Sequence, residues 1–156
     1  MRQAWAVVIA LLILPADLSA ASAVPVEDVL SEVDLFGNWA IDCSQEASPA
    51  NPHVAVVLQS PGVVTESHDL GPDFAGNRYS VVSAARLPRE LLAIEVIFRP
   101  GTDGEQHQKL TLLIRKGTRR TMFNQPDGGE VRVKDGVALG HGVKTPVLRK
   151  CGEGGA

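Results

Sequence analysis

Several short segments of this chain alternate between apolar and polar residues. In one of them, Leu92, Ile94 and Val96 fall on one face of an extended backbone, and the residues between them fall on the other. The segments 109–115 and 130–134 alternate in the same way. Because successive side chains of a strand point to opposite faces, this period of two predicts half-buried β-strands.

Proline and glycine separate these segments. Proline fixes φ and glycine accepts positive φ, so both favour tight turns between strands. Turn sequences of this kind stand at 59–62, 71–73, 87–90, 100–104, 126–129 and 135–136. The strands expected between and around them are 36–43, 54–58, 63–70, 79–85, 92–98, 109–115, 119–124, 130–134 and 143–151. We expect an all-β fold, a small antiparallel meander of about eight strands that forms a barrel or a sandwich after a short helix at 26–34.

The first 23 residues have the layout of a secretory signal peptide. Arg2 precedes an apolar run, Ala4 to Leu14, and Ala21-Ser22-Ala23 supplies small residues for cleavage. The run is about half the roughly 20 residues that a membrane-spanning helix needs. We therefore expect a mature chain that begins at Val24, has no integral membrane segment, and is periplasmic or secreted. The preference for Arg, Ala and Gly suggests a bacterial source.

The remainder of the chain is expected to be one domain, 24–151, with a disordered tail at 152–156. It contains two cysteines, Cys43 and Cys151, and an exported protein meets an oxidising environment. Neither cysteine belongs to a C-x-x-C motif. We expect them to form a disulfide that joins the two ends of the fold.

The composition argues against several classes of function. With 44% hydrophobic and 21% charged residues the chain is globular, and a net charge of −3 provides no basic field for DNA or RNA. No phosphate-binding loop, dinucleotide motif, H-E-x-x-H or G-x-S-x-G is present. We expect no enzyme, no cofactor and no nucleic-acid partner.

The expected first strand contains Gly37-Asn38-Trp39. This Gly-x-Trp at the start of an antiparallel series resembles the lipocalin and calycin group of small barrels, and the chain is also similar to the barrel-type periplasmic inhibitors of metalloproteases. The resemblance implies that Trp39 plugs the closed end of a barrel beneath a basic residue of the last strand, such as Arg149 or Lys150. The Thr-Asp-Tyr-like loop motif of lipocalins is not visible. A regular strand would place Trp39, Ile41 and Cys43 on one face.

Three groups of residues are candidates for sites. Trp39 either anchors the core or stacks on a ligand. The basic cluster Arg115, Lys116, Arg119 and Arg120 is expected to be exposed at a turn, where it either keeps the edge soluble or docks an acidic protein partner. Glu66 and His68 share a face of one strand and permit a copper or zinc site, provided that the fold brings a third ligand.

The leading functional hypothesis is a non-enzymatic periplasmic binding or accessory protein, which engages a small hydrophobic ligand or an envelope protein. In the second hypothesis the exposed segment 24–34 enters the active site of a secreted protease and inhibits it. In the third, a metal-handling protein is built around His68. The loop 44–53 after the first strand is expected at the open mouth of the barrel, as a lid or as a plain connection.

Overall fold

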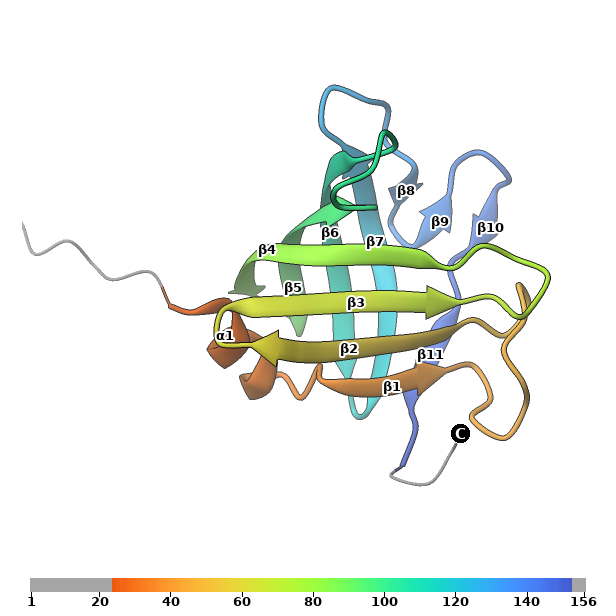
Figure 1. Ribbon diagram of the computed structural model, residues 1–156, viewed down its shortest axis with the longest axis horizontal. Coiled ribbons are helices and arrows are strands. Elements are labelled where there is room, and N and C mark those ends of the chain that lie inside the picture. The colour runs from red at the N-terminus through yellow and green to blue at the C-terminus, as the bar shows by residue number, and fades with distance from the viewer. Residues whose placement is uncertain (1–23, 153–156) are drawn as a thin grey trace, which may run out of the picture.

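The computed structural model describes residues 24–152, which form a barrel with a short helix at one end (Figure 1). The predicted signal peptide, 1–23, lies outside these residues, as do residues 153–156 of the predicted tail. Within residues 24–152, no helix is both long and apolar enough to cross a membrane.

Eight antiparallel strands close the barrel, which confirms the all-β prediction and selects the barrel over the sandwich. They are β1 (Gly37–Ala40), β2 (His53–Ser60), β3 (Val63–Asp69), β4 (Asn77–Leu87), β5 (Leu91–Phe98), β6 (Gln106–Arg115), β7 (Thr118–Pro126) and β11 (Val147–Lys150). Each strand pairs with the next along the chain, and β11 closes the barrel between β7 and β1.

Three two-residue strands extend the sheet beyond β7: β8 (Val133–Lys134), β9 (Val137–Ala138) and β10 (Val143–Lys144). The predicted strands 130–134 and 143–151 were therefore too long. The first is cut short because it lies between the turn after Pro126 and the turn at Asp135 and Gly136, both of which have positive φ. The second is divided at Pro146, which has no N–H to give to a sheet.

The predicted lead helix is present as α1 (Val26–Glu32) and closes one end of the barrel. Figure 1 shows α1 beside the turn from β2 to β3, and Glu27 Oε1 accepts a hydrogen bond from the Gly62 N–H of that turn, at 3.1 Å. Val29 and Leu30 are buried in the core. The expected exposure of segment 24–34 as an inhibitory arm is wrong for the helix, because its apolar face covers the barrel end.

The barrel core is concentrated near this capped end. Leu92, Ile94 and Val96 are buried as their alternation predicts, and Leu112 of the neighbouring strand faces them. The opposite end, from which the loops between β1 and β2 and between β3 and β4 extend, is the mouth (Figure 1). At the capped end the interior holds the buried apolar side chains of the core, while toward the mouth polar side chains enter it.

The first strand is shorter than predicted. Trp39 and Ala40 are both buried, whereas Ile41 is 38% exposed, so the expectation that Trp39, Ile41 and Cys43 share a face is wrong. The strand ends at Ala40 because the chain enters a turn in which the Asp42 carboxylate accepts hydrogen bonds from the N–H and O–H of Ser44.

The predicted disulfide between Cys43 and Cys151 is confirmed, with a Cα–Cα distance of 5.6 Å. The two cysteines follow β1 and β11, whose pairing closes the barrel through only two register pairs, at Trp39 and Ala40. The Cys151 N–H also donates to the carbonyl of Asn38 at 2.8 Å. The disulfide therefore reinforces the seam of the barrel, which is the pairing of β1 with β11.

Candidate functional site

A cavity of about 390 Å³ lies inside the barrel on the side of the mouth. Its wall is built mainly from inward side chains of the barrel strands, together with residues of the segment that follows β7. The apolar part of the lining comprises Pro52, Val54, Tyr79, Phe98, Leu110, Val133, Pro146 and Leu148. The polar part comprises Glu66, His68, Asn77, Gln108, Arg119, Arg120, Thr121, Asn124, Arg132 and Thr145.

Strand β3 explains why the interior becomes polar toward the mouth. Its inward residues are Val64, Glu66 and His68, in order from the capped end. Val64 is fully buried in the core, Glu66 is buried at mid-barrel, and His68 is partly exposed in the cavity. The inward face of β3 thus changes toward the mouth from an apolar side chain to a carboxylate and then to an imidazole ring.

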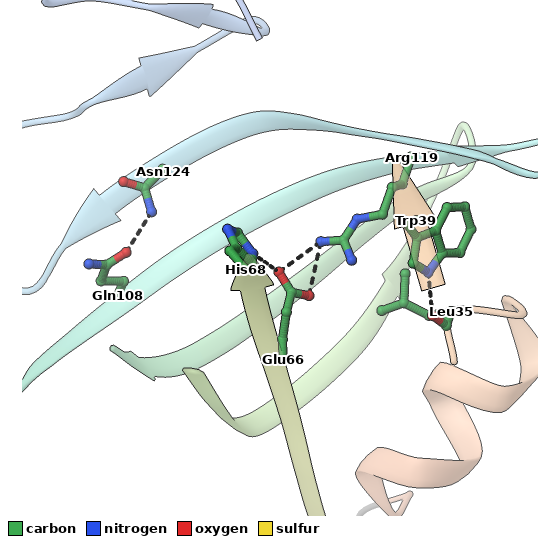
Figure 2. Close-up of polar contacts among 7 residues, drawn as sticks. All are labelled: Leu35, Trp39, Glu66, His68, Gln108, Arg119 and Asn124. Carbon is green, nitrogen blue, oxygen red and sulfur yellow. Dashed lines mark hydrogen bonds and ion pairs between the residues drawn. The ribbon is translucent and has the colours of Figure 1, made fainter. Parts of the chain in front are cut away.

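Glu66 and Arg119 form a buried ion pair at the base of the cavity (Figure 2). Arg119 Nη2 donates to both carboxylate oxygens of Glu66, at 3.0 and 2.9 Å. His68 Nε2 lies 2.6 Å from Glu66 Oε1. Arg119 and Glu66 are 4% and 6% exposed, so the pair is almost removed from water and its contacts are correspondingly strong.

The environment of Glu66 keeps it ionised. Burial alone would raise the pKa of its carboxyl group, but the adjacent Arg119 guanidinium and the hydrogen bond from His68 outweigh burial and lower the pKa to about 2. Glu66 is therefore an anion at neutral pH with both oxygens engaged. A carboxylate of this kind can stabilise the fold or bind a ligand, but it carries no proton to donate at neutral pH.

Acid is expected to remove the stabilisation that ionised Glu66 provides. Its pKa is lower in the folded protein than the ordinary value of about 4.3 in an unfolded chain, so the contribution is complete above about pH 5 and is lost as the pH falls toward 2. The loss amounts to about 3 kcal/mol. Urea unfolding of the wild type and of Glu66→Gln at successive pH values should show their stability difference narrowing through this window. A constant difference would contradict the prediction.

Below the cavity, two cations lie near the ring of Trp39. Its ring centroid is 5.9 Å from Arg119 Cζ and 5.6 Å from Lys150 Nζ, and its Nε1 donates to the Leu35 carbonyl at 2.9 Å. Of the two basic residues predicted for this position, Lys150 occupies it and Arg149 is exposed. Trp39 is not part of the cavity wall, so it supports the site from beneath and does not line it.

The prediction that the four basic residues form one exposed patch is wrong. Arg115 and Lys116 are exposed at a two-residue turn, and Arg115 Nε lies 3.2 Å from a carboxylate oxygen of Glu90. Arg119 instead points into the barrel. Arg120 is half-buried against the segment after β7, where it donates to the Gly136 carbonyl at 2.7 Å. The alternation of β7 separates these neighbours in sequence, so no continuous docking surface results.

The structure brings together the two residues predicted for a metal site, but it supplies no third ligand within residues 24–152. Glu66 and His68 do share a face and touch. Among residues 24–152, however, no group of three or more His, Cys, Asp or Glu side chains is placed to hold a metal ion. Both oxygens of Glu66 already accept from a guanidinium, whose positive charge opposes a cation at this position.

Two further features of the wall were missed by sequence reasoning. Asn124 Nδ2 donates to Gln108 Oε1 at 2.9 Å, and Gln108 Nε2 and Arg132 Nη2 both donate to Gln106 Oε1, at 3.0 and 3.1 Å (Figure 2 shows the first of these bonds). The sequence does contain a signal for this feature, because Gln106 and Gln108 continue the period of two of Leu110 and therefore fall on the same inward face of the strand. The amides form a polar ladder along the cavity.

The second missed feature is a series of rings. Successive ring centroids of His68, Tyr79 and Phe98 are 5.0 and 5.2 Å apart. Burial first, and then the negative charge of Glu66, raise the pKa of Tyr79 to about 12, which keeps its hydroxyl protonated. The cavity thus has an aromatic wall on β3, β4 and β5 in addition to its amide ladder.

The loop between β1 and β2, residues 41–52, lies at the mouth, where the loop 44–53 was expected, and His53 belongs to β2. Pro52 contributes to the cavity lining. Buried Asn51 organises the loop, because its Nδ2 lies within 3.3 Å of the carbonyl oxygens of Asp42, Gln45 and Glu46. The loop also packs on Gly71 of the β3–β4 loop, where a Cβ atom would lie 2.7 Å from the Ala47 carbonyl oxygen. These contacts describe a packed rim more than a free lid.

Comparison of the chain with protein-family models, with curated proteins and with solved structures finds no match. The cavity itself therefore carries the functional proposal.

Proposed function

We propose that the protein is a non-enzymatic binding protein that holds a small, partly apolar molecule in its barrel cavity. The observation that carries this proposal is the cavity of about 390 Å³, which falls within the roughly 300 to 1,000 Å³ of typical small-molecule sites. Its lining combines apolar and aromatic surface with a few polar groups held by fixed hydrogen bonds. This mixture is typical of sites that bind and orient a small ligand.

Export to the periplasm of a bacterium, or secretion, is part of the proposal. The signal-like leader at 1–23 and the disulfide between Cys43 and Cys151 support it, because disulfides persist in oxidising compartments. The proposal favours a small ligand over a docked envelope protein, because the exposed basic patch expected for such docking is not formed. No observation favours protease inhibition or metal handling over ligand binding.

Binding in the cavity can be tested with the neutral fluorescent probe N-phenyl-1-naphthylamine. Leu110 lines the cavity, whereas Leu113 of the same strand faces outward. Leu110→Trp is expected to fill the cavity and weaken probe binding by about tenfold or more, equivalent to about 1.4 kcal/mol. Leu113→Trp adds the same side chain outside and is expected to leave binding unchanged. Fluorescence titration of the three proteins measures the difference.

The result that would overturn the proposal is the absence of saturable binding to the wild type. Equal weakening by both substitutions would also overturn it, because the probe would then lie on the outer surface.

A further inference from the structure

We infer that the ligand of this cavity is a small organic anion with a planar ring, whose acidic group is bound at the mouth by Arg132. The inference rests on the proposed function and deepens it by naming the chemical class of the ligand.

The charges of the lining carry the first step. Three arginines line the cavity, Arg119, Arg120 and Arg132, but only one carboxylate does, that of Glu66. Arg119 neutralises Glu66, and the ion pairs among residues 24–152 include neither of the other two arginines. The cavity of a chain with a net charge of −3 therefore has an excess of positive charge. A site of this kind attracts anions and disfavours cations.

The two arginines differ in how they are held. Arg120 is fixed, because its Nε donates to Thr145 Oγ1 at 3.2 Å and its Nη2 to the Gly136 carbonyl. Gly136 has a φ of +72°, which favours glycine, and a Cβ atom there would lie 2.7 Å from Arg120 Nη2, so another residue would force this side chain to shift. Arg132 is exposed at the rim, and its Nη2 donates to the amide oxygen of Gln106. The Arg132 guanidinium keeps further N–H donors at the rim, which match the oxygens of an acidic group.

The aromatic wall supplies the second step. Tyr79 and Phe98 line the same cavity with ring centroids 5.2 Å apart, and Phe98 pairs in register with Gln106, the partner of Arg132. A planar ring in the cavity gains contact with these aromatic faces while its acidic group remains near Arg132. The positive charge at the rim thus favours the acidic group of the ligand, and the aromatic rings below it favour the planar ring of the same molecule.

A matched pair of probes tests the inference. 1-Anilinonaphthalene-8-sulfonate and N-phenyl-1-naphthylamine share a ring system, and only the first has an acidic group. The wild type is expected to bind the sulfonate at least about tenfold more tightly than the neutral probe, because hydrogen bonds to charged groups are the strong ones. Arg132→Gln should remove most of this preference and leave the neutral probe unaffected. The control is Arg149→Gln, an exposed arginine of β11 outside the lining.

Fluorescence titrations of the three proteins give distinct outcomes. Loss of the preference in Arg132→Gln, with retention in Arg149→Gln, supports the inference. Equal affinities of the wild type for the two probes overturn it and leave the proposed function in place. Equal weakening of sulfonate binding by both substitutions also overturns it, because the attraction then depends on overall charge. Saturable binding of neither probe overturns both this inference and the proposed function.

Discussion

Removal of the disulfide between Cys43 and Cys151 is expected to lower the free energy of unfolding by about 4 to 5 kcal/mol. The bridge joins residues 108 positions apart, so it closes nearly the whole domain into one loop. The chain-entropy model attributes the stabilisation of so long a loop mainly to the restriction of the unfolded chain. A loss of this size is a large fraction of the stability of an ordinary domain.

The measurement is urea unfolding of the wild type and of the double variant Cys43→Ala/Cys151→Ala. The variant should unfold at a lower urea concentration with a larger m-value, because its unfolded chain exposes more surface. Reductant should shift the wild type toward the variant and leave the variant unchanged. The structure also locates the weakened region, since amide exchange should increase first in β1 and β11, which share only two register pairs. A loss below about 1 kcal/mol would show that the closed barrel holds its seam without the bridge.

Replacement of one member of the buried pair, Glu66 or Arg119, is expected to cost about 3 to 5 kcal/mol. Glu66→Gln leaves the Arg119 guanidinium in a buried position without a counter-ion, and Arg119→Met leaves the buried carboxylate with His68 as its remaining partner. The cost is largely that of a buried, unpaired charge. The double variant Glu66→Gln/Arg119→Met buries no charge at this position, so its loss should be clearly smaller than the sum of the single losses.

A double-mutant cycle by urea unfolding measures this coupling. A double variant whose loss of stability equals the sum of the two single losses would contradict the prediction. Single losses of about 1 kcal/mol or less, as for surface ion pairs, would also contradict it. The double variant also serves as a control for folding, because it retains the shape of the interior without either charge.

Much of the fold could be predicted because the relevant forces act locally. The alternation of Leu92, Ile94 and Val96 predicts which face of β5 is buried, and the proline and glycine turns predict where strands end. Where prediction was wrong, a local feature was outweighed by a specific contact. Ile41 continues the alternation of Trp39 in the sequence, but the Asp42 turn ends the strand one residue earlier.

The candidate site was less accessible to prediction because its contacts join distant strands. Glu66 and His68 lie two residues apart on β3, and their contact followed from the period of two. Arg119 lies 53 positions from Glu66 and stands in a run of basic residues that resembles an exposed turn. Its inward direction is visible only when the register of β7 against β11 pairs it with Leu148.

The sequence by itself determined that the chain is a strand-rich domain with Trp39 buried and Cys43 bridged to Cys151. Period, turn chemistry and the count of cysteines are properties of short segments or of composition, and they do not depend on how the strands are arranged. Only the tertiary structure decided that the barrel closes, that α1 covers one end, and that Glu66 meets Arg119 beneath a cavity. These depend on strand register, which sets which side chains of distant strands point inward at the same height.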